Sequence, residues 1–99
     1  MPKKSAELLD EISLAYLLRD KGLTHLRVRR SGTLLVLESG PKTDAERHAR
    51  FRRQSAQVWQ LEMPYRSKWE VTPFRGRVDE LLEILISTLP WTLAPVGTP

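Results

Sequence analysis

The sequence predicts an α+β domain: an N-terminal helix, an antiparallel β-meander of four or five strands, and a C-terminal helix packed on the same face. Three observations lead to this fold class. Leucines recur at helical spacing near both ends of the chain, over residues 8–18 and 78–89. Between these segments, apolar and polar residues alternate as they do in half-buried strands. Turn-forming pairs such as Ser31-Gly32 separate the alternating runs.

The first helix is expected to begin at Ser5, whose hydroxyl can cap an amide of the first turn, and to end at Gly22. One set of apolar residues recurs at helical spacing and forms a stripe: Leu8, Leu9, Ile12, Ala15 and Tyr16. A second set widens that stripe: Leu14, Leu17 and Leu18. We therefore expect the helix to be covered on more than one side.

A hairpin follows, with strands over 23–30 and 33–38 and a two-residue loop at Ser31-Gly32. In this register Arg30 pairs with Thr33 and His25 lies opposite Glu38. The period of two then places one set of residues on the core face: Leu26, Val28, Leu35 and Leu37. The opposite face carries Arg27 beside Val36 and Arg29 beside Leu34.

The stretch over 44–53 is ambiguous, because Thr43 and Glu46 resemble a capping box while residues 48–52 alternate like a strand. We prefer a short helical turn that becomes a strand near Ala49. A strand over 57–63 and a turn over 64–67 come next. The returning strand, 68–72, is expected to turn Trp69 and Val71 toward the core.

The last helix is predicted from about Arg77 to Thr88, with an inward stripe of Val78, Leu81, Leu82, Leu85 and Leu89. Pro90 ends it, and 91–99 is an extended tail whose Trp91 is expected to fold back on the core.

Length and composition limit the functional classes. The chain has 99 residues, so we expect a single domain over 1–99 with flexible tails at 1–4 and 92–99. Cysteine is absent, which excludes disulfides, thiolate catalysis and cysteine-based metal sites. Acidic residues interrupt the segment after the N-terminal lysines, and no apolar stretch approaches the ~20 residues of a membrane span. We expect a cytoplasmic protein without membrane contact.

Several features in order along the chain resemble the uncharacterised bacterial domain family DUF3024, over about residues 32–88. They are the strand end at 35–38, Ala49-Arg50-Phe51-Arg52, Trp59-Gln60-Leu61, Lys68-Trp69-Glu70, the loop at Pro73 and the amphipathic segment 79–85. The chain departs from the family at Arg53, where an aromatic residue is expected, and in the tail after Trp91. The resemblance implies a bacterial α+β meander and brings no function with it.

The sequence offers little for catalysis. The best dyad is His25 with Glu38, which the expected register places side by side, but no nucleophile or oxyanion donor accompanies it. His25, His48 and a carboxylate are a weak basis for a metal site. We therefore expect no enzyme, no metal and no cofactor, and take the dyad as a surface charge pair.

The basic residues are concentrated in the middle of the chain. The net charge is +4, yet residues 19–53 carry ten lysines and arginines against four acidic residues. The strand registers place a set of arginines and aliphatic residues on the outer sheet face: Arg27, Arg29, Leu34, Val36, Arg50 and Arg52. Arginine suits bidentate recognition of phosphate or carboxylate.

Three interpretations of this outer face remain open. It is a solvated polar surface, a protein interface or a weak, sequence-independent nucleic-acid surface. We favour a small non-enzymatic module that binds a protein partner or forms a homodimer, with outward Leu34, Val36 and Val58 buried between copies. Its arginines would then pair with acidic residues of the other copy: Glu38, Glu62 or Glu70. Nucleic acid is the alternative, weakened because Phe51, Trp59 and Trp69 are all expected on the core side.

Overall fold

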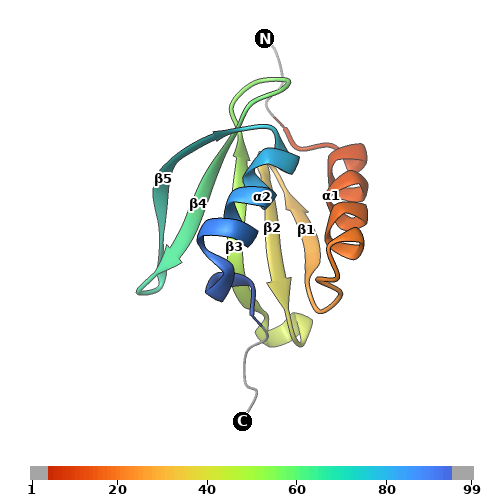
Figure 1. The fold of residues 1–99 in the computed structure, drawn as a ribbon, viewed down its shortest axis with the longest axis vertical. Helices are drawn as coiled ribbons and strands as arrows, with labels where there is room; N and C mark the ends of the chain where they lie inside the picture. The colour runs from red at the N-terminus through yellow and green to blue at the C-terminus, as the bar shows by residue number, and fades with distance from the viewer. Residues whose placement is uncertain (1–4, 95–99) are drawn as a thin grey trace.

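The five strands lie side by side in chain order and form an antiparallel meander, β1-β2-β3-β4-β5. The computed structural model describes residues 5–94. The strands are β1 Arg27–Ser31, β2 Leu34–Ser39, β3 Glu46–Arg53, β4 Trp59–Tyr65 and β5 Lys68–Gly76. Figure 1 shows helices α1 (Leu8–Asp20) and α2 (Val78–Thr88), with α2 crossing in front of the sheet and α1 lying along its β1 edge. The α+β fold predicted from the sequence is confirmed.

One hydrophobic core fills the space between the helices and the inner face of the sheet. Its fully buried members come from both helices and the three central strands: Leu14, Leu18, Leu35, Leu37, Phe51, Leu61, Leu81, Leu82 and Leu85. The stripe predicted for α2 is confirmed, since Val78 and Leu89 also pack against this core. The opposite face, here called the outer sheet face, is covered by neither helix, and it is the face on which the sequence places the arginines.

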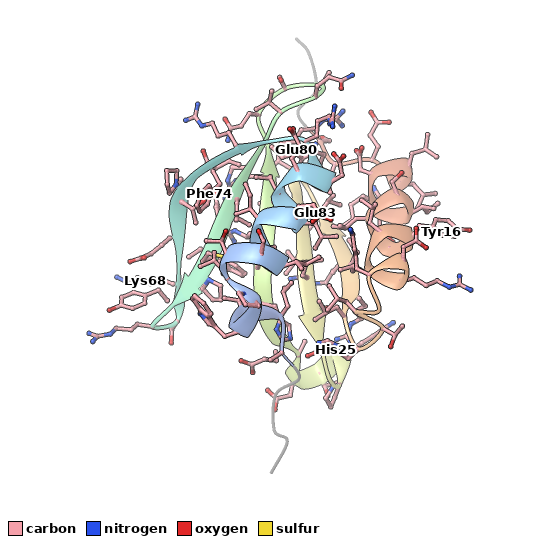
Figure 2. All side chains as sticks on the ribbon, in the orientation of Figure 1. Tyr16, His25, Lys68, Phe74, Glu80 and Glu83 are labelled. Atoms are coloured by element: carbon pink, nitrogen blue, oxygen red, sulfur yellow. The ribbon has the colours of Figure 1, made fainter. Side chains whose placement is uncertain are left out.

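The apolar stripe predicted on α1 faces solvent instead of the core, so this part of the prediction is wrong. Leu9 is 73% exposed and Tyr16 60% exposed, whereas Leu14 and Leu18 are buried. Tyr16 points away from the body of the protein in Figure 2. The inward side carries acidic residues, which form ion pairs across the contact: Asp10 with Arg53, and Glu11 with Arg30. The helix also begins later than expected, with Glu7 rather than Ser5 at its N-cap, and it ends before Gly22 as predicted.

The β1–β2 hairpin has a different register from the predicted one. Its turn residues are Gly32 and Thr33, so Val28 pairs with Leu37 instead of Leu35. Gly32 adopts a φ of +58°, a conformation that glycine reaches without steric cost. The slip is two residues in the partner strand, so every side chain keeps its predicted face. The residue opposite Glu38, however, becomes Arg27 rather than His25.

The ambiguous stretch resolves mainly as a strand. The helical turn, η1, occupies Lys42–Asp44, and β3 begins at Glu46 rather than near Ala49. A bulge interrupts the β2–β3 pairing, where Leu37 faces Ala49 but Glu38 faces Arg47. The bulged residue, His48, is 3% exposed.

The β4–β5 hairpin turns later than predicted, at Arg66 and Ser67, both of which have positive φ. Trp69 therefore pairs with Pro64, while Glu70 pairs with the core residue Met63. Because directly paired residues share a face, Glu70 lies on the inner side and Trp69 on the outer one. The prediction that Trp69 and Val71 face the core is wrong.

The chain after α2 folds back as a second 3-10 turn, η2 (Pro90–Leu93). Its buried residue is Leu93, while Trp91 is 69% exposed, so the prediction for Trp91 is wrong. Two histidines hold this turn against the sheet: His25 Nε2 lies 2.6 Å from the carbonyl of Leu93, and His48 Nδ1 lies 2.7 Å from that of Thr92. Thr92 and Leu93 thus belong to the folded part. The prediction of a flexible tail over 92–99 is therefore wrong at its start, and the predicted tail at 1–4 and residues 95–99 lie outside the described residues.

Candidate functional site

The outer sheet face brings together the six residues that the sequence assigned to it. Arg29 on β1, Val36 on β2 and Arg50 on β3 are neighbours in one cross-strand row. Leu34 and Arg52 form the adjacent pair, and Arg27 lies beside Glu38 at the other end of β1. The antiparallel registers therefore gather four arginines from two strands on one surface.

Glu38 holds the two arginines of β1. Its side chain is 6% exposed and accepts from Arg27 Nε at 3.3 Å and from Arg29 Nε at 3.1 Å. Arg27 also donates to the carbonyl of Gly40 through Nη1, while its Nη2 is buried and finds no acceptor within residues 5–94. Both arginines of β1 thus contact Glu38 through Nε, which holds their side chains over this end of the face.

Glu62 holds the two arginines of β3 in the same way. Its side chain is 4% exposed, and it accepts from Arg50 Nε at 2.5 Å and from Arg52 Nε at 2.8 Å. Burial acts to raise the pKa of Glu62, but the hydrogen bonds and positive charges of Arg52 and Arg50 outweigh burial, so its pKa lies below the ordinary value. Glu38 and Glu62 thus each pair with two guanidinium groups. Each set of one carboxylate and two arginines keeps a net positive charge.

The aliphatic residues of this face are less available than predicted. Val36 is 2% exposed, and its cross-strand neighbours are Arg29 and Arg50. Long arginine stems can cover apolar surface while their charged heads stay in water. Leu34 is half-buried, and Val58 is exposed just before β4. The prediction that Val36 faces outward is right, but the prediction that it is exposed is wrong.

Trp69 adds an aromatic ring to the outer sheet face, although it was predicted on the core face. The guanidinium carbon of Arg50 lies 4.4 Å from the centre of its ring, a cation–π contact. Trp69 remains partly exposed and lines a depression of about 200 Å³ with Arg47 and Lys68. The signal was available in the sequence: the expected turn over 64–67 pairs Met63 with Lys68 and Glu62 with Trp69, which already places Trp69 on the outer face, as its pairing with Pro64 does in the structure.

A larger open cleft of about 780 Å³ lies beside β1. Five basic residues line it: Arg27, Arg29, Arg30, Lys42 and Arg47. Glu11, Glu38 and Asp44 also line it, and Glu11 and Glu38 are already paired with arginines. Arg47 borders both hollows, and Glu46 lies beside it in the one that Trp69 lines.

The predicted His25–Glu38 dyad does not form. The hairpin register puts Arg27 opposite Glu38, and His25 instead contacts the carbonyl of Leu93. The rings of His25 and His48 lie edge to face with centres 6.2 Å apart. Within residues 5–94 no group of three or more histidine and acidic side chains could hold a metal ion.

No family model matches the chain, and neither a curated protein nor a solved structure is significantly similar to it. The resemblance to DUF3024 therefore stays a prediction. Among the helices of residues 5–94, none has the length and apolar character needed to cross a membrane.

Proposed function

We propose that this chain is a non-enzymatic binding module whose outer sheet face binds single-stranded nucleic acid with little sequence preference. The observation that carries the proposal is Trp69, which lies on the same face as four arginines that buried glutamates hold in place. Proteins that bind single strands without reading sequence combine a basic surface with aromatic rings on which bases stack. The basic part was predicted from sequence, and Trp69 is the aromatic part.

Two of the four arginines, Arg29 and Arg50, suit phosphate because their terminal nitrogens have no hydrogen-bond partner within residues 5–94. The terminal nitrogens of Arg27 and Arg52 are bonded or buried. Arg29 is 46% exposed in its side chain and uses Nε to reach Glu38, which leaves its terminal nitrogens for a ligand. Arg50 uses Nε in the same way and stacks on Trp69. A phosphate can therefore bind without first breaking an ion pair, so less ordering free energy is lost on binding.

Self-association through this face stays a prediction, but two of its premises do not hold. Val36 is buried, which removes one aliphatic contact between copies. Glu38 and Glu62 are paired with arginines of their own chain, which removes two of the three acidic partners expected from a second copy. A surface with spare positive charge and few free carboxylates fits a polyanion better than a copy of itself.

Fluorescence anisotropy with a labelled single-stranded oligonucleotide tests the proposal. If four phosphates are neutralised, affinity should fall about 50-fold between about 50 mM and about 200 mM salt. Trp69→Ala should weaken binding about tenfold, and Trp69→Phe should restore part of the loss. Arg29→Gln should weaken binding several-fold and lower the salt dependence.

The matched control is Arg77→Gln, which removes the same charge from the N-cap of α2, on the helix-bearing side. It should bind like the unmodified protein. Equal losses for Arg29→Gln and Arg77→Gln would contradict a specific face, and no binding at low salt would end the proposal. An acidic peptide of glutamates that binds as tightly as the oligonucleotide would identify a protein partner instead.

A further inference from the structure

Helix α1 is apolar on two opposite sides, although residues 5–94 cover only one of them. Leu14 and Leu18 face the core and are buried. The other side shows a continuous stripe of residues one helical turn apart: Leu8, Ile12, Ala15 and Tyr16, with Leu9 beside them. A helix with apolar residues on opposite sides is typically covered on both. The sequence prediction that α1 is covered on more than one side is therefore unmet in a single copy.

We propose that the outward stripe of α1 binds the same stripe of a second copy, with the two helices antiparallel about a two-fold axis near Ile12. In this arrangement Leu8 of each copy packs against Tyr16 of the other. Leu9, which is 73% exposed, meets the small Ala15 of the other copy. The stripe is thus complementary to itself in size, which an isologous contact requires.

The charges at the two ends of α1 favour the antiparallel direction. The first turn is acidic and the last turn carries Arg19. Glu7 is 70% exposed in its side chain, and its ion-pair contact with Arg53 is long, at 4.0 Å. An antiparallel pair brings Arg19 of one copy close to Glu7 and the positive N-terminus of the other, and it also opposes the two helix dipoles. A parallel pair would place like charges together.

The size of the stripe sets the expected affinity. Its exposed large side chains are Leu8 at 55%, Leu9 at 73%, Ile12 at 41% and Tyr16 at 60%. They present roughly 400 Å² of apolar surface per copy. Together with the side chains that border the stripe, two copies would bury on the order of 1,000 Å² of surface, which is the size of weak and transient interfaces. We expect a dissociation constant on the order of 100 µM.

Sedimentation equilibrium of the full chain, from about 10 µM to about 1 mM, should show a monomer that becomes a dimer. Ile12→Glu places two carboxylates at the axis and should keep the protein monomeric at all these concentrations. Trp91→Glu is the matched control, because Trp91 is equally apolar and 69% exposed but lies in η2. It should dimerise normally. A monomer throughout, or a dimer that survives Ile12→Glu, would overturn the proposal.

The absence of natural cysteine allows a test of direction by single introduced cysteines. Under mild oxidation Ile12→Cys should cross-link to itself. Leu8→Cys and Tyr16→Cys should each fail to do so alone and should cross-link when mixed. A Leu8→Cys homodimer would show parallel helices and refute the arrangement. Ile12→Glu should still bind the oligonucleotide, so this proposal and the nucleic-acid proposal can fail separately.

Discussion

Replacing Glu62 by glutamine tests whether the buried carboxylates organise the outer sheet face. The variant keeps the shape of the side chain and removes the charge that Arg50 and Arg52 share. Removing one partner of a buried ion pair costs about 3–5 kcal/mol. Water reaches the arginines in part, since their side chains are 17% and 38% exposed. We therefore expect the low end, a loss of about 3 kcal/mol in the free energy of unfolding.

Urea unfolding at neutral pH measures this loss, with Glu70→Gln as the control. Glu70 is exposed on β5 and its replacement should change stability by less than about 0.5 kcal/mol. The folded state lowers the pKa of Glu62, so its charge stabilises the fold above the ordinary value of 4.5, and this contribution is lost as pH falls through the folded value. The difference in the free energy of unfolding between the native protein and Glu62→Gln should stay constant down to about pH 4.5 and then narrow. Equal stability of Glu62→Gln and Glu70→Gln would refute the reasoning. So would a difference between the native protein and Glu62→Gln that widens in acid.

Two further stability predictions concern the β4–β5 turn and the C-terminal anchor. Ser67 has a φ of +68°, so Ser67→Gly should stabilise the protein by about 0.5–1 kcal/mol in urea unfolding, and Ser55→Gly, in the β3–β4 loop, should not. His48→Ala removes a buried ring that contacts Ser39 Oγ and the Thr92 carbonyl, and should cost about 3 kcal/mol. His25→Ala removes one contact to the same segment and should cost about 1 kcal/mol; equal costs would contradict the assigned roles.

Helix α1 shows why the periodicity of a sequence can predict a helix and still misplace its faces. Apolar residues on both sides satisfy the helical period equally, so the pattern cannot choose between them. The usual rule turns charged residues toward water. In this fold Asp10 and Glu11 turn inward instead, because Arg53 and Arg30 on the sheet offer partners that lie far away in sequence. The choice therefore depends on contacts between elements.

The outer sheet face also combines features that the sequence predicts with features that depend on contacts between elements. Arg27, Arg29, Arg50 and Arg52 were assigned correctly, since a period of two survives a register slip of two residues. Their glutamate partners depend on which strands are neighbours, and the contact between Arg50 and Trp69 depends on the registers of β3, β4 and β5. The predicted and observed turns differ by two residues, which leaves the face of Trp69 unchanged, so pairing 68–72 with β4 would have placed Trp69 outward.

The concentration of basic charge in the middle of the chain, the lack of cysteine, the order of the elements and the apolar stripe of α2 follow from the sequence alone, because each depends on residues close together in the chain. The tertiary structure decided which side of α1 is buried, how the arginines are paired and that Trp69 lies against Arg50. These outcomes depend on side chains brought together from distant segments, whose contacts compete for the same partners.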